Sequence, residues 1–421
     1  MTTSVSDDNA GLARAHRLRR MTGRDPAEAH RAATPLELLF DLTFVVAFSF
    51  AGNAVSHAFA EGHWRNGLIG FGIAVFAIVW AWINYSWFAS AFDTDDWLFR
   101  VTTGVQMVGV VIFALGIPAM FDSLEQGDTL DNRVMVAGYV VMRVAMLAQW
   151  LRAARRCSGA LRRTCLIYAT TLAVAQLGWV LLIIVNFSIP VTVVMVLVMV
   201  GIELVGPVVG ERNAPTPWHA DHIAERYSLL AIIALGEGIV GGAVSLSAAV
   251  EEQGWDWQTW LIAITGVGLT VAMWWVYFLL PSAEVLEAER GKAFVWGYGH
   301  YLVFAAIVAV GAGLHVVAYY LEHEAHISEL AAVLTVAIPV GVYVISIVLL
   351  TSYLVGRILP MYLGLGSVSL LVLVIAAVAA AMHAPVAICL VIVALAPVVA
   401  VVGYEARGYR LHAAALVDRA G

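Results

Sequence analysis

The feature that most constrains this chain is a series of apolar stretches, each about twenty residues long, that recur along nearly its whole length. A helix needs about 20 apolar residues to cross the hydrocarbon core of a bilayer. Windows of this length predict twelve spans, at about residues 36–58, 67–91, 99–120, 134–152, 163–185, 188–208, 222–248, 257–280, 294–318, 330–351, 358–381 and 384–403. Two joins between these spans, at 186–190 and 383–385, are so short that each is either a hairpin or a kink, so ten or eleven spans are alternatives.

Composition and backbone chemistry fix the fold class. The chain is 61% hydrophobic and 13% charged, whereas soluble domains carry about 25% charged residues. In hydrocarbon every backbone N–H and C=O group must be satisfied within the protein, and a helix does this inside one segment. We therefore predict an all-α polytopic transmembrane helical bundle of about 12 spans.

The positions of the basic residues predict the orientation. If the amino terminus is cytoplasmic, all of the 23 Lys and Arg residues fall on the cytoplasmic side except Arg65, Arg133 and Arg143, as the positive-inside rule expects. The opposite loops are acidic, for example at 121–132 and 251–257. This alternation favours an even number of spans, both termini in the cytoplasm, and a multi-pass protein of the cell (cytoplasmic) membrane.

The two halves of the chain share a faint pattern. Each opens a span with a glutamate, Glu37 or Glu225, and follows about fifty residues later with a span rich in Trp and Tyr. This similarity favours a parallel repeat of six plus six spans, although unrelated apolar helices also resemble one another. We expect a basic, disordered cytoplasmic tail at residues 1–33 and a first six-helix half at 34–208. A cytoplasmic linker at 209–221, a second six-helix half at 222–403 and a cytoplasmic tail at 404–421 complete the expected organisation.

Two carboxylates stand in the first turns of the first span. Glu37 and Asp41 are four residues apart, so they project from the same face of a helix, where lipid is an unfavourable neighbour. One interpretation is a structural salt bridge with Arg100 or Arg226. A second is a proton or cation site, in which two close carboxylates share one proton. A third is a pair of interfacial carboxylates with no particular role.

A second group of ionisable residues marks the seventh span. His222, Glu225 and Arg226 lie at its start, and Glu237 lies about 16 Å deeper than Arg226, near the middle of the membrane. A charged carboxylate at that depth is costly unless it is paired or protonated. Glycines on both sides of Glu237 permit close helix packing or a local break in the helix. Three interpretations are open: a proton or substrate pathway, a neutral glutamic acid that is hydrogen-bonded across a helix contact, and a local ion pair.

Arg143 lies about halfway along the fourth span, where it requires a carboxylate partner. We expect it to face Glu237, Glu203 or Asp41 inside the bundle. Glu203 is placed near the cytoplasmic end of the sixth span, where a structural role is favoured.

Three further polar residues are candidates: His300 for the ion, proton or substrate pathway, and Asp93 and Asn84 as secondary candidates beside Glu203 and His222. His300 lies inside the ninth span, where it is either a proton carrier or a hydrogen-bond partner between helices. Asp93 belongs to an acidic turn with Asp95 and Asp96, which favours capping of the next helix over a cation site. Asn84 lies among tryptophans that line either a cavity or the core.

The chain lacks the motifs of several common activities. It contains no P-loop, no Rossmann glycine motif, no HExxH and no GxSxG, so neither ATP-driven transport nor the common hydrolase chemistries are supported. The three cysteines have no metal-binding spacing. We therefore expect no cofactor, no metal site and no assigned catalytic residue.

The stretches ATPLELLFDLTFVVAFS, FDTDD, ERYSLLAIIALGEGIVGG and YGH resemble those of the bacterial low temperature requirement A (LtrA) family. That family carries a PxELFFDLVFV-like first span and an ERxxxxxIxxLGE segment, and the first Phe of its FF pair is Leu39 here. The resemblance implies an integral membrane protein of a family named for a cold-growth phenotype, whose molecular activity is not settled. The matching positions are Glu37, Phe40, Asp41, Asp93, Asp95, Asp96, Glu225, Arg226, Gly236, Glu237 and His300.

Buried ionisable residues on several helices favour a secondary transporter or an ion- or proton-coupled carrier, with Glu37, Asp41, Arg143 and Glu237 around one hydrated cavity. The alternatives are a membrane-embedded enzyme or lipid-related factor, and a non-catalytic scaffold or sensor. The expected partners are the lipid bilayer and a small solute or ion. Nucleic acid is not expected, and a homo-oligomer is compatible with the sequence.

Overall fold

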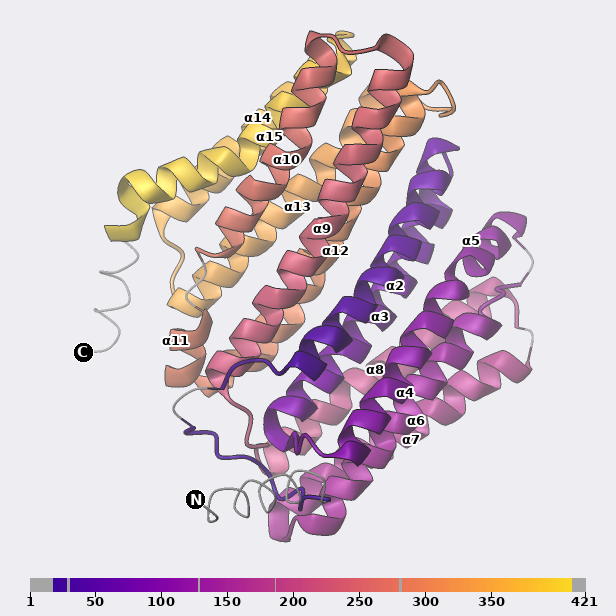
Figure 1. The fold of residues 1–421 in the computed structure, drawn as a ribbon, viewed down its shortest axis with the longest axis vertical. Helices are drawn as coiled ribbons and strands as arrows, with labels where there is room; N and C mark the ends of the chain where they lie inside the picture. The colour runs from indigo at the N-terminus through magenta and orange to yellow at the C-terminus, as the bar shows by residue number, and fades with distance from the viewer. Residues whose placement is uncertain (1–17, 29–30, 128, 186, 280–281, 411–421) are drawn as a thin grey trace, which may run out of the picture. The chain divides into compact units, whose positions relative to one another are not determined.

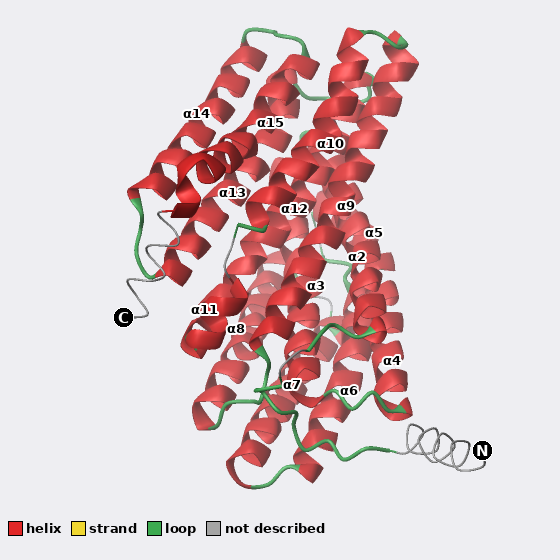
Figure 2. Cartoon of the chain, turned by 60° about the vertical axis from the view of Figure 1, so that its left-hand side comes forward, coloured by secondary structure: helices red, strands yellow, loops and turns green. Residues whose placement is uncertain are grey.

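The computed structural model describes residues 18–28, 31–127, 129–185, 187–279 and 282–410. Every regular element within these residues is helical, as the secondary-structure colouring in Figure 2 makes plain. Twelve helices in the described parts of the chain are long and apolar enough to cross a membrane. The predicted fold class and span count are therefore confirmed, whereas the six-plus-six repeat and the cytoplasmic location of both termini stay predictions.

The chain divides into two compact units that do not coincide with the expected halves. Unit 1 consists of the chain up to Ala47 together with Trp80–Ile223, and unit 2 consists of Phe48–Val79 and the chain from Ala224 onward. The helices α2 (Pro35–Ala60), α3 (Trp64–Phe92) and α9 (Ala220–Gln253) contribute to both units.

The difference from the expected halves concerns the hairpin between α2 and α3. Its residues contact the second half of the chain: Phe76 stacks on Tyr301 with 5.3 Å between the ring centroids. The backbone N–H of His326 donates to the carbonyl of Ala60 at 2.8 Å. These contacts join segments more than two hundred residues apart, so no local sequence signal predicts them.

Unit 1 is built from α4 (Trp97–Leu115), α5 (Ile117–Gln126), α6 (Arg133–Arg156), α7 (Gly159–Ile184) and α8 (Ile189–Asn213), with one end each of α2 and α3. Helix α4 packs along α6, α6 along α7, and α7 along α8, as Figure 1 shows for the magenta helices. Glycines allow the closest approach, since a Cβ added to Gly138 of α6 would lie 2.6 Å from the carbonyl oxygen of Gly109.

Unit 2 contains most of α9, then α10 (Trp257–Tyr277), α11 (Ser282–Ala288), α12 (Ala293–Leu321), α13 (Glu329–Val355), α14 (Pro360–Ala381) and α15 (Val386–Gly403). Helix α12 packs along α13, and α15 packs against both α10 and α14. The join between α14 and α15 is a hairpin, because His383 adopts φ 59° and Pro385 precedes the first residue of α15.

The described part of the amino-terminal segment is ordered, unlike the disordered tail expected for residues 1–33. The backbone N–H of Arg24 donates to the carbonyl of Ala91 at 2.9 Å, and Met21 is 1% exposed. The backbone N–H of Arg19 donates to Asp96 at 3.0 Å. Residues 1–17, 29 and 30 lie outside the described residues.

Candidate functional site

The first carboxylate of α2 is set by the way the helix begins. The Thr34 backbone N–H donates to Glu37 Oε2 at 2.8 Å, and the Glu37 N–H donates to Thr34 Oγ1 at 3.3 Å. This reciprocal pair is a capping box, and Pro35 occupies the first helical position, where its missing N–H costs nothing. The sequence TPLE carries this signal, which sequence reasoning missed. Glu37 is thereby held in the first turn of α2, in the part of the helix that belongs to unit 1.

Both α2 carboxylates have buried partners within unit 1. His222 Nε2 lies 3.1 Å from Glu37 Oε1, and neither side chain is exposed. The indole N–H of Trp82 donates to Asp41 Oδ1 at 2.6 Å. Trp82 is therefore a hydrogen-bond partner of Asp41 rather than only an apolar wall. Arg100, considered as a partner for this pair, instead binds Asp95 at the surface.

Arg31 and Asp93 add two more charges near Glu37. The guanidinium of Arg31 donates to the carbonyls of Ala89, at 2.7 Å, and Ser90, so it caps the end of α3. Burial lowers the pKa of Arg31 to about 10. Burial, together with repulsion from Glu37, raises the pKa of Asp93 to about 6, although Arg31 opposes this rise. The pKa of Asp93 therefore lies closer to neutral pH than that of an ordinary aspartate.

The acidic turn after α3 is a structural cap. Asp96 is the N-cap of α4, where its side chain accepts the Phe99 N–H at 3.0 Å and also pairs with Arg152. The Asp95 N–H donates to Asp93 Oδ1 at 2.7 Å. The expectation of a capping turn is confirmed, and no His, Cys, Asp and Glu cluster suited to a metal ion occurs among the described residues.

Arg143 has one carboxylate partner, Glu203, within unit 1. Arg143 is 2% and Glu203 4% exposed. Tyr139 OH donates to Glu203 Oε2 at 2.6 Å, which also accepts from Arg143, while Trp179 Nε1 donates to Oε1 at 3.0 Å. Gln176 adds a longer contact to Oε1, at 3.4 Å. Four donors from α6 and α7 thus surround this α8 carboxylate.

This pairing selects one of the three carboxylates expected for Arg143 and corrects the placement of Glu203. Helix α8 continues through Pro207 to Asn213, so Glu203 lies ten residues, about 15 Å, before its end. It is therefore a mid-helix residue, not one near the end of the span. Tyr139 and Trp179, the two aromatic donors, were missed because apolar packing explains buried aromatics equally well from sequence.

Glu237 occupies a different kind of site, in unit 2. It lies at the midpoint of α9, is 5% exposed, and accepts a hydrogen bond from the Ser49 hydroxyl of α2. Among the described residues it forms no ion pair. Ser49 was missed, because a lone serine in an apolar span carries no distinctive signal.

Glycines bring α12 and α10 close to α9 around this carboxyl. A Cβ added to Gly311 of α12 would lie 2.9 Å from the backbone carbonyl oxygen of Glu237, and one added to Gly241 would lie 2.5 Å from the carbonyl oxygen of Gly311. A Cβ on Gly242 would lie 3.2 Å from the Cα of Gly266. Helix α9 is continuous here. The glycines therefore serve close packing, which was one of the two expectations, and not a break in the helix.

His300 lies in an aromatic box in unit 2. Its Nδ1 lies 2.8 Å from the carbonyl oxygen of Trp296, which can only accept, so Nδ1 carries the proton. Its Nε2 then accepts from Tyr277 OH at 3.1 Å. The rings of Tyr227 and Phe304 pack around it at centroid distances of 4.9 and 5.6 Å. This geometry supports the hydrogen-bonding interpretation of His300.

The remaining candidates have simpler surroundings. Arg226 is fully buried and Glu225 half-buried, both at the start of the unit 2 part of α9. Asn84 donates to the carbonyl of Trp80, one turn back along its own helix, at 2.9 Å. Arg143 pairs with Glu203 inside unit 1, and Glu237 accepts from Ser49 inside unit 2. The expectation of one polar centre shared by Glu37, Asp41, Arg143 and Glu237 stays a prediction.

Twelve apolar helices with hydrogen-bonded charges buried inside them define a polytopic α-helical membrane protein. Residues 32–402 match the family described as Bacterial low temperature requirement A protein (LtrA), and the chain belongs to this family. It is also similar to an uncharacterized protein of Rhizobium meliloti (strain 1021), with 25% identity over 306 residues, 69% of this chain and 70% of that relative. No solved structure matches the chain.

Proposed function

We propose that this protein is a secondary transporter of the cell membrane, an ion- or proton-coupled carrier in which Glu237 binds and releases the coupling proton. The observation that carries the proposal is the setting of Glu237, a buried carboxyl at the middle of a membrane-length helix with a hydroxyl as its partner. A charge at this depth costs several kcal/mol. The neutral, protonated form avoids that cost.

The partner of Glu237 suits a group that changes its protonation state. A serine hydroxyl both donates and accepts hydrogen bonds. Ser49 therefore donates to the carboxylate and accepts from the protonated acid, so the contact survives in both states. Glu203 differs in this respect, because the guanidinium of Arg143 and the indole of Trp179 can only donate to it. The contacts of Glu203 therefore suit a carboxylate only, whereas the Ser49 contact of Glu237 accommodates both the carboxylate and the acid.

The enzyme alternative has less support. General acid–base catalysis requires a side chain within hydrogen-bond reach of a substrate. His300 is enclosed by aromatic rings, and the His222 and Glu37 pair has no exposed surface. A scaffold predicts no flux at all, so a transport measurement separates it from a carrier.

The test is proton movement into liposomes that contain the purified protein. The liposomes are loaded with a pH-sensitive dye, and a potassium diffusion potential drives protons inward, with or without a small-solute extract of bacterial cells outside. We expect the dye response of the wild type to depend on the protein and to be abolished in Glu237→Gln. The matched control is Glu251→Gln, an exposed glutamate near the other end of α9.

Thermal unfolding in detergent accompanies the flux measurement to show that both variants fold. A Glu237→Gln variant that folds normally and carries protons at the wild-type rate would refute the assigned role. Wild-type liposomes that match protein-free liposomes under every condition would refute the carrier.

A further inference from the structure

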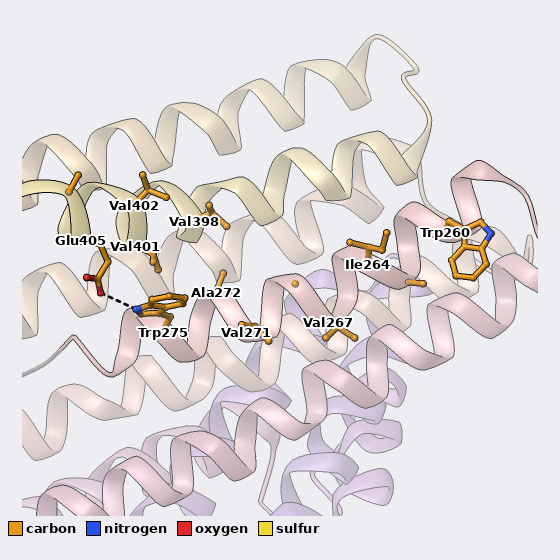
Figure 3. Close-up of a pocket in the computed structure, with 13 residues that line it drawn as sticks. Trp260, Ile264, Val267, Val271, Ala272, Trp275, Val398, Val401, Val402 and Glu405 are labelled. Atoms are coloured by element: carbon orange, nitrogen blue, oxygen red, sulfur yellow. Dashed lines mark hydrogen bonds between the residues drawn. The ribbon is translucent and has the colours of Figure 1, made fainter.

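A long apolar groove runs between α10 and α15 in unit 2. Its cavity volume is about 1060 Å³, at the upper limit of the range of about 300–1,000 Å³ found for small-molecule sites. Figure 3 shows Trp260 at one end and Trp275 with Glu405 at the other. The two tryptophans are fifteen residues apart on α10, about 22 Å along the helix. A groove of this length exceeds the depth of one leaflet, about 15 Å.

The groove is lined by apolar side chains with one charged exception. Twelve of the thirteen residues that line the groove are apolar or aromatic, and Glu405 is the acidic exception. Val398, Val401 and Val402 lie beside it, as Figure 3 shows. Glu405 accepts a hydrogen bond from Trp275 Nε1 at 3.2 Å and forms no ion pair among the described residues. The groove thus combines a hydrocarbon-like wall with one carboxylate, whose hydrogen-bond partner among the described side chains is the indole of Trp275.

The position of Glu405 matches the depth of a lipid headgroup. It is the second-last residue of the last apolar helix, Val386–Ala406. Tryptophan beside it is typical of the membrane interface, where the indole N–H reaches polar groups. The valines then lie where acyl chains begin, and a chain in the groove would extend from Glu405 toward Trp260.

We propose that this groove binds a phospholipid with an ethanolamine headgroup, with the ammonium group against Glu405 and one acyl chain along the valines. Charge complementarity selects the headgroup. An ethanolamine ammonium has three N–H donors for the carboxylate and a positive charge that the Trp275 ring also attracts. A choline headgroup has no N–H donor, and a glycerol headgroup leaves the lipid with a net negative charge that Glu405 repels.

The experiment is native mass spectrometry of the purified full chain after equilibration with equal amounts of phosphatidylethanolamine, phosphatidylcholine and phosphatidylglycerol with identical acyl chains. We expect the wild type to retain the ethanolamine lipid about threefold over the other two, a preference within the range that an exposed ion pair gives. Glu405→Gln should lose this preference, while Glu287→Gln, an exposed glutamate of α11, should keep it.

A second variant tests the groove itself. Gly268 lines it, and a Cβ added there would meet no atom within 4 Å, so Gly268→Phe fills the groove without a clash at Cβ. We expect this variant to fold and to retain less lipid. Equal retention of the three lipids by the wild type, or an unchanged preference in Glu405→Gln, would overturn the proposal. A Gly268→Phe variant that alters the oligomeric mass but not lipid retention would also overturn it, and would assign the groove to contact between copies of the chain.

Discussion

The ion pair between Arg143 and Glu203 allows a double-mutant cycle whose sign follows from the structure. Arg143→Met removes the cation and leaves a carboxylate at lipid depth with three neutral donors. Glu203→Gln removes the charge of the acid and turns an N–H₂ group toward the guanidinium. Each single change leaves one buried charge uncompensated, which costs about 3–5 kcal/mol of unfolding free energy.

The double variant should be more stable than either single variant. Without Arg143, a glutamine at 203 can accept from Trp179 with its oxygen and donate to the Tyr139 hydroxyl with its nitrogen. No buried charge then remains, and replacing a buried ion pair by neutral groups is often close to neutral. We expect the double variant to cost about 0–2 kcal/mol, so the two changes compensate each other.

The assay is unfolding of the detergent-solubilised protein by titration with sodium dodecyl sulfate, followed by tryptophan fluorescence. The control is Arg100→Met, which breaks the exposed pair with Asp95 and should change stability by no more than the error of the measurement. If the double variant loses the sum of the two single losses, the charges do not compensate each other, and the reasoning about this pair is refuted.

Two further predictions concern stability. Gly241→Ala should destabilise the protein by about 1–3 kcal/mol, because its Cβ would lie 2.5 Å from the backbone of α12. Gly236→Ala should instead stabilise the protein by about 0.5–1 kcal/mol, because a Cβ there meets nothing within 4 Å. Thermal unfolding of both variants tests this pair of expectations. The second prediction concerns Asp93, whose pKa is raised from 3.8 to about 6. The folded protein therefore binds the Asp93 proton more tightly than the unfolded chain does. Because of this difference, the free energy of unfolding should fall by up to about 3 kcal/mol as pH rises from about 4 to 6. Asp93→Asn should remove this slope from unfolding curves measured between pH 4 and 7, and an unchanged slope would refute the assignment.

The sequence predicted the spans well because their length is set by the thickness of the bilayer. Apolar windows therefore located each helix, and the cost of a lone guanidinium in lipid predicted that Arg143 would have a carboxylate partner. The choice of Glu203 among three carboxylates depends on which helices are neighbours. That choice arises from the packing of α6 on α7 and of α7 on α8, which periodicity does not encode.

Two errors have a common physical cause. The tail was expected to be disordered because it is rich in arginine, yet Arg31 binds the free carbonyls at the end of α3. Glu203 was placed near the end of its span because the sixth span was predicted to end at residue 208, yet the helix continues to Asn213. In both cases the expectation rested on local composition alone, and only the capping signal in TPLE was readable beforehand.

The two mid-helix glutamates, Glu203 and Glu237, separate structural from functional charge. Glu203 is surrounded by groups that include a guanidinium and an indole, which can only donate, so protonation would break contacts that stabilise the fold. Glu237 has a hydroxyl partner that tolerates either state. Neutralising Glu203 should therefore lower stability, whereas neutralising Glu237 should leave stability near the wild-type value and abolish proton movement. If both substitutions instead reduced stability alike and left flux intact, Glu237 would be a structural residue like Glu203, and the proposed carrier would lose its proton site.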